Sequence, residues 1–190
     1  MIPKAIEQAE RHYLTAVKSA DELRSAKSFD DAMSAWSSFL SASSTIYAKL
    51  EQGAKGCSKS EPWFGTKRVL RKSDPLLRYI LVSRNVDTHG IEDVTIKSSD
   101  NPFLNFNEMV PVVVSFDDDE TGLPVELDAI CAGPTLKLNR VECKRYGAAD
   151  PPGVHLGKDV PFGRDYPHAV AKLALEYLRS LIDEAKRLPS

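Results

Sequence analysis

The chain has 190 residues, 42% of them hydrophobic and 27% charged, a composition typical of a soluble globular protein. No apolar run approaches the roughly 20 residues that a membrane helix needs, and residues 1–7 lack the apolar stretch of a signal peptide, so we expect a cytoplasmic protein with no membrane partner. The net charge of −2 argues against strong nonspecific nucleic-acid binding by the whole chain.

The N-terminal part of the chain shows the spacing of two amphipathic helices. Apolar residues recur at helical spacing over 4–26, and a second such pattern covers 29–52. Ser28, which is followed closely by two aspartates, is typical of a helix N-cap. Gly53 and Gly56 are expected to end the second helix. The short turn between the two helices predicts that they pack antiparallel.

A third helix is predicted in the middle of the chain. Before it, the pattern allows a short helix over 66–72. Asp74 and Pro75 predict the start of the third helix, because aspartate is a good N-cap and proline fits the first helical position. We expect this helix to cover 75–89 and to stop at Gly90.

After Gly90 the pattern changes from helical spacing to short β-branched runs. These runs predict strands at 94–97, 110–116, 127–130 and 136–141. Residues 117–122 are expected to form a turn, and 151–153 a loop.

A last amphipathic helix is predicted over 167–187. The fold class expected is therefore α+β: a helical bundle over 1–91, then a β-rich extension over 92–190 with a small antiparallel sheet and a C-terminal helix, packed on the bundle as one unit. The two parts differ in charge. The first has 14 Lys or Arg against 10 Asp or Glu, which gives +4, and the second has 11 against 17, which gives −6.

The end of the third predicted helix carries the residue types of phosphodiester chemistry. Arg84 can hold a phosphate through its planar fork of donors, and His89 can move a proton near neutral pH. Asn85 can bind the phosphate or orient the arginine. If the substrate is RNA, these groups would support attack of a 2′-hydroxyl on the adjacent phosphorus, with a 2′,3′-cyclic phosphate as product and no need for a metal.

A basic tract precedes this motif, and its cations are candidates for RNA binding: Lys67, Arg68, Arg71, Lys72 and Arg78. Trp63 or Phe64 would then stack on a base. The alternative interpretation is a solvated charged face with Trp63 and Phe64 buried as anchors.

Cysteine and histidine do not show the spacing of a metal site. No Cys-x-x-Cys pair occurs, and we expect reduced thiols, no metal and no cofactor. The residues concerned are Cys57, Cys131, Cys143, His12, His89, His155 and His168.

The segment Arg84-Asn85-Val86-Asp87-Thr88-His89 resembles the R-x4-6-H signature of the HEPN superfamily, in which Asn, Asp or His usually follows the arginine. The resemblance covers roughly residues 1–90 and implies a HEPN-like helical bundle. It also implies a metal-independent endoribonuclease that acts as a homodimer, with Arg84, Asn85 and His89 as catalytic residues.

The resemblance suggests that such a ribonuclease could be a toxin or an antiviral defence nuclease, with an antitoxin or a defence-system partner. Other members are noncatalytic, which leaves a dimeric binding or scaffold module as the alternative. Some HEPN toxins have a tyrosine two residues after the histidine, where a partner enzyme attaches nucleotides. Ile91 stands at that position here, so this regulation is not expected.

Helix geometry bears on how the motif would work. Five residues turn an ideal helix by roughly 500°, so Arg84 and His89 point about 140° apart. Either the last turn is distorted, or two copies share their sites across a two-fold axis. Without a functional role, Arg84 would form an ion pair and His89 would be a favourable helix C-terminal residue. The acidic run 117–120 suggests a third interpretation, a metal-dependent hydrolase.

Overall fold

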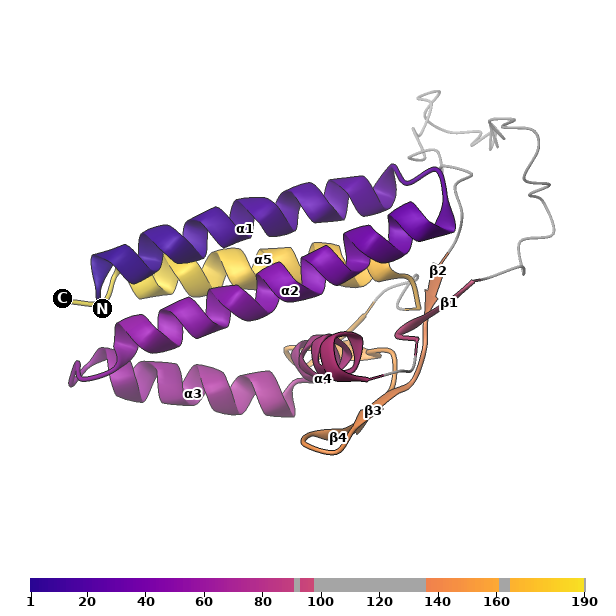
Figure 1. Cartoon of the computed structure of the whole chain (residues 1–190). Coiled ribbons are helices and arrows are strands. Elements are labelled where there is room, and N and C mark those ends of the chain that lie inside the picture. Colours follow the sequence, from indigo (N-terminus) through magenta and orange to yellow (C-terminus); the bar gives the residue numbers. More distant parts are fainter. Residues whose placement is uncertain (91–92, 98–135, 161–164, 190) are drawn as a thin grey trace, which may run out of the picture.

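The computed structural model describes residues 1–90, 93–97, 136–160 and 165–189. The described residues are mostly helical, with small antiparallel sheets, so the α+β class and the C-terminal helix are confirmed. The helices are α1 (Pro3–Arg24), α2 (Phe29–Ala54), α3 (Ser60–Ser73), α4 (Pro75–His89) and α5 (Pro167–Lys186). Helices α1, α2 and α5 lie lengthwise beside one another. Helices α3 and α4 lie on the other side of α2, and α4 is seen nearly end-on, so its axis crosses the direction of the long helices (Figure 1).

Within the described residues, the strands form three two-stranded antiparallel ladders. They pair β1 (Thr95–Lys97) with β2 (Leu136–Leu138), β3 (Val141–Cys143) with β4 (Gly147–Ala149), and β5 (Val154–His155) with β6 (Lys158–Asp159).

The prediction of one strand over 136–141 is wrong. The chain leaves the first ladder at Asn139, whose backbone N–H still donates to Val94 and whose carbonyl accepts from the hydroxyl of Tyr79. It then turns so that Val141, 1% exposed, packs in the core. The predicted strands at 110–116 and 127–130 and the turn at 117–122 lie outside the described residues.

The predicted helix boundaries at Ser28, Asp74 and Gly90 are confirmed. The side chain of Ser28 accepts a hydrogen bond from the backbone of Asp31, and Asp74 accepts one from Leu77 at 2.9 Å. At the other end of α4, the backbone N–H of Gly90 donates to the carbonyl of Val86. These side chains and turns satisfy backbone groups that a helix end leaves unpaired.

Helix α3 is longer than the short helix predicted over 66–72. It begins at Ser60, because Pro62 falls in the first turn, where proline has no hydrogen bond to lose. Gly53 was expected to end α2 but lies inside it, buried against α1. A Cβ at Gly53 would stand only 2.3 Å from the Cβ of Ala5, so glycine allows the close approach of the two helices.

Helix α4 is buried on nearly all sides. It packs against α2, α3 and α5 and against strands β3, β4 and β5. Its buried residues are Leu76, Leu77, Tyr79, Ile80, Leu81, Val82, Ser83 and Val86. Near its C-terminal end, Asp87 and Thr88 are exposed. The motif is therefore carried at the solvent-facing end of a core helix.

Helix α5 closes the bundle from the C-terminal part of the chain. Leu178, Leu181 and Ile182 belong to the same hydrophobic cluster as the core residues of α1, α2 and α4. One core thus includes residues from both sides of residue 91. Within the described ranges, no helix combines the length and the apolar character that crossing a bilayer requires.

Candidate functional site

Arg84 lies near the C-terminal end of α4, and no described residue supplies a counter-ion for it. Its side chain is half-buried, and its Nε is fully buried with no hydrogen-bond acceptor. If Arg84 had only a structural role, we would expect it to form an ion pair, and the described residues contain no such pair. The Nε–H is therefore a buried donor without an acceptor, on a half-buried guanidinium that has no carboxylate partner in the described part of the chain.

Arg71 of α3 lies close to Arg84. Its guanidinium sits over the ring of Tyr47, 4.0 Å from the centroid, and its Nη2 is 3.5 Å from the hydroxyl of Ser44. Burial lowers the pKa of the Arg71 guanidinium, and the nearby Arg84 lowers it further. The carboxylate of Glu51 is also near, but it is bound to Arg68. Two like charges therefore share one region, an arrangement that an added anion would stabilise.

The rest of the motif is engaged differently. The side-chain amide of Asn85 donates to the carbonyl of Leu81 at 2.7 Å, within the helix. Asp87, which lies between the two motif residues, accepts from the hydroxyl of Ser37 on α2. His89 is the last residue of α4, and its side chain lies outside what the structure describes.

Two cations of the predicted RNA-binding tract are paired within the fold. Lys67 contacts the carboxylate of Glu184 at 2.6 Å, and Arg68 contacts Glu51 at 2.7 Å. Burial alone would raise the pKa of Glu184, but hydrogen bonds from Lys67 and from Trp63 hold it below its usual range.

Trp63 and Phe64 are packed into the fold, as the alternative to base stacking predicted. Phe64 is 3% exposed, and Trp63 is half-buried with its indole N–H bound to Glu184.

Of the other three cations of the tract, Arg71 lies beside Arg84, and two line a surface pocket beside α4. Lys72 and Arg78 form this pocket with Leu81, Arg145 and Tyr146, and its volume is about 370 Å³. Arg78 donates from Nη2 to the carbonyl of Tyr146 at 2.9 Å, which ties α4 to the turn between β3 and β4. Arg145 and Tyr146 were not predicted as site residues, because only the fold brings this turn to α4.

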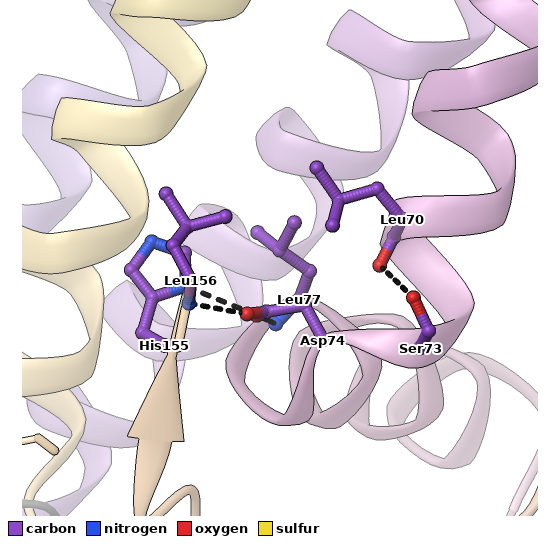
Figure 2. A network of polar contacts seen from close by, with 6 residues as sticks. All are labelled: Leu70, Ser73, Asp74, Leu77, His155 and Leu156. Atoms are coloured by element: carbon purple, nitrogen blue, oxygen red, sulfur yellow. Dashed lines mark hydrogen bonds and ion pairs between the residues drawn. The ribbon is translucent and has the colours of Figure 1, made fainter. Parts of the chain in front are cut away.

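A second polar cluster holds the opposite end of α4 (Figure 2). Asp74 lies between Leu77, His155 and Leu156, with its Oδ1 3.0 Å from Nδ1 of His155 and its Oδ2 bound to the backbone N–H of Leu156. Asp74 is 5% exposed. The sequence identified Asp74 only as a cap, and no local pattern could reveal a partner 81 positions away.

The polar cluster around Asp74 continues into the core through His155. The ring of His155 meets that of Tyr177 edge-on, with centroids 6.0 Å apart. The hydroxyls of Tyr177 and Tyr47 influence each other's pKa, yet neither makes a hydrogen bond with good geometry. Burial is the main cause that raises the pKa of both phenols. This cluster fixes the start of α4, whereas the motif lies at its end.

Comparisons with protein-family models, with curated proteins and with solved structures found no match. The HEPN resemblance therefore stays a prediction carried by the motif and by its place on α4. Among the described residues, no group of three or more His, Cys, Asp and Glu is placed to hold a metal ion. The acidic run 117–120 lies outside those residues.

Proposed function

We propose that this protein is a metal-independent endoribonuclease of the HEPN type, with Arg84 and His89 as its catalytic pair. The observation that supports this most is the state of Arg84: a half-buried guanidinium with an unpaired buried Nε, beside Arg71 and without an ion pair to any described residue. An RNA phosphate would supply the missing anion, and its charge in the transition state would be held by both arginines.

The proton transfers are assigned to His89. Removal of the proton from a 2′-hydroxyl lets that oxygen attack the adjacent phosphorus, and protonation of the leaving 5′-oxygen completes the cleavage. Arg84 stabilises the charge on the nonbridging oxygens. The bond to the 5′-oxygen breaks as the 2′-oxygen bond forms, so the product ends in a 2′,3′-cyclic phosphate.

We propose further that two copies share the site. Helix α4 is continuous to His89, so positions 84 and 89 lie about 140° apart around its axis and not on one face. A two-fold contact at the exposed end of α4, near Asp87 and Thr88, would bring Arg84 close to the partner subunit's His89.

A second candidate function is a noncatalytic HEPN-like dimeric module that binds RNA or an antitoxin-like or defence-system partner. One observation favours it: the amide of Asn85 is bound to the carbonyl of Leu81 inside the helix, so that donor is not directed at a substrate. This module would keep the anion-binding arginines without performing cleavage.

The test is incubation of the purified protein with mixed RNAs in EDTA, beside Arg84→Ala and His89→Ala. Matched controls are Arg24→Ala and His12→Ala, which remove the same residue types from α1. We expect cleavage in EDTA by the wild type and both controls, and none by the motif variants. If the wild type binds RNA but leaves it intact under all conditions, the noncatalytic module is the better assignment.

A further inference from the structure

The pocket between α3, α4 and the β3–β4 turn has an unusual charge balance. Of its five lining residues, three are cations, and none is a carboxylate: Lys72, Arg78, Leu81, Arg145 and Tyr146. The remaining two offer an apolar side chain and an aromatic ring. Three like charges around one hollow repel one another, and a bound anion would relieve that repulsion.

The cations of this pocket are not neutralised by the rest of the described chain. Lys72 and Arg145 are exposed and form no ion pair with a described residue. Arg145 instead lies over the ring of Tyr146, 5.2 Å from its centroid. On the same hairpin, Arg140 is paired with Asp150. The three cations that line the pocket thus have no carboxylate partner among the described residues.

One of the cations is also held in place. Arg78 donates from Nη2 to the carbonyl of Tyr146 at 2.9 Å, and this bond leaves its other donors available. It links a rigid core helix to the turn that carries Arg145. The pocket thus has a positioned guanidinium in its wall and two exposed cations at its edges.

We propose that this pocket binds one nucleotide unit, with its phosphate among Lys72, Arg78 and Arg145 and its sugar and base against Leu81 and Tyr146. The volume of about 370 Å³ falls in the range of roughly 300–1,000 Å³ that small-molecule sites occupy. Aromatic rings accept any base by stacking, so the pocket would not require a particular sequence. The unit is either a free mononucleotide or one residue of an RNA strand.

The alternative in which the bound nucleotide belongs to an RNA strand rests on the proposed function. The position of Arg71 supports this alternative. Arg71 is electrostatically coupled both to Tyr146 at the pocket and to Arg84 at the motif. Arg78 and Arg84 are six residues apart, about 9 Å along the helix. The two positions also lie about 120° apart around the helix axis, so a strand with one nucleotide in the pocket would have to pass around α4, beside Arg71, to bring a neighbouring phosphate to Arg84.

The experiment measures binding of AMP by calorimetry and of a fluorescent six-nucleotide RNA by anisotropy, in EDTA. The variants are Lys72→Ala and Arg145→Ala, and the control is Lys144→Ala, which removes an exposed cation from the same turn but outside the pocket. We expect the pocket variants each to weaken binding about tenfold or more. The control should change it less than about twofold, and inorganic phosphate should compete.

The two ligands distinguish the sources. Pocket-dependent binding of AMP supports a free nucleotide as the source, and pocket-dependent binding of the RNA alone supports the strand. Absence of binding of both ligands, or an equal loss in Lys144→Ala, overturns the proposal. Arg84→Ala separates the two proposals, because it should abolish cleavage while AMP binding remains. A protein that binds AMP in the pocket but cuts no RNA would refute the ribonuclease and keep the pocket.

Discussion

Nδ1 of His155 lies 3.0 Å from Oδ1 of Asp74, in a pair that joins the β5–β6 hairpin to the first turn of α4. Because an ionised carboxylate only accepts hydrogen bonds, Nδ1 is the donor. The same carboxylate accepts from the backbone of Leu77 and Leu156. One buried side chain thus serves as helix cap and as hairpin clamp.

Asp74→Ala should lower the free energy of unfolding by about 3 kcal/mol or more. The loss of a cap costs about 1 kcal/mol, and two further buried donors lose their acceptor at about 1–3 kcal/mol each. Urea unfolding measures the change. Asp30→Ala, which removes an exposed carboxylate from the first turn of α2, should cost less than about 1 kcal/mol. Equal effects of the two substitutions would show that the clamp contributes little.

Arg84→Ala and His89→Ala should each reduce RNA cleavage about 100-fold to 1,000-fold, because each removes a group that stabilises charge or transfers a proton. Arg84→Lys should recover little activity, since an ammonium lacks the planar fork. Single-turnover cleavage rates measure this, and unchanged thermal melting shows that the fold is intact. Cleavage that survives both alanine substitutions would exclude the assignment.

The protein should form a dimer through the exposed end of α4. At roughly 10–50 μM, a range that detects weak association, light scattering should give twice the mass of the chain. Thr88→Arg places like charges at this contact and should shift the protein toward monomer. Thr15→Arg adds the same charge at an exposed position of α1 and should not. A wild type that stays monomeric would contradict the shared site.

Gly53→Ala should destabilise the fold by about 1–3 kcal/mol, because its new Cβ would overlap the Cβ of Ala5, an atom without rotational freedom. Gly65→Ala provides the opposite case. Gly65 lies within α3 with open space around the position of a Cβ, so alanine there should stabilise by about 0.4–1 kcal/mol. Thermal or urea unfolding of the two variants should show a loss of stability for Gly53→Ala and a gain for Gly65→Ala.

Cys57 should react with iodoacetamide as a thiolate near neutral pH. The nearby Ser60 hydroxyl and the backbone N–H groups of Ser60 and Lys59 favour the thiolate and lower the pKa of the Cys57 thiol to about 6. In a Cys131→Ser, Cys143→Ser background, the rate should rise with a midpoint near pH 6 and then level off.

The ionisation of Cys57 should also make the free energy of unfolding depend on pH. Because the folded-state pKa is depressed, the contribution of the thiolate is present at high pH and is lost as the pH falls through about 6. Unfolding in urea should move the reactivity midpoint toward roughly 8.5. Because the Ser60 hydroxyl has no other hydrogen-bond partner among the described residues, Ser60→Ala measures how much this hydroxyl contributes to the lowered pKa of Cys57. An unchanged midpoint in urea would contradict this account.

Local signals were sufficient for the helices. The caps at Ser28 and Asp74 and the stop at Gly90 act within a few residues, and the sequence displays them directly. Local signals failed where tertiary contact decides. Gly53 reads as a terminator, but its role is the close approach of α1, and the strand expected over 136–141 bends at Asn139 because the chain must cover α4.

In the candidate site, too, some features follow from the local sequence and others only from tertiary contacts. Arg84 could be selected by its residue type and helical position, but its lack of a counter-ion depends on its three-dimensional neighbours. The basic tract has the pattern of one charged surface, yet Lys67 and Arg68 are bound to carboxylates of two other helices, α5 and α2. Arg145 carried no signal, because its meeting with Arg78 follows from the fold of the β3–β4 turn.

The burial of α4 has a consequence for how the site can be lost. A helix enclosed by other elements opens only when the cooperative unit around it unfolds, so its amide hydrogens should exchange with the slowest class in the protein. The position of Arg84 is then tied to global stability rather than to a local motion. A destabilising change as remote as Gly53 would leave the shape of the site intact and reduce the population of molecules that possess it.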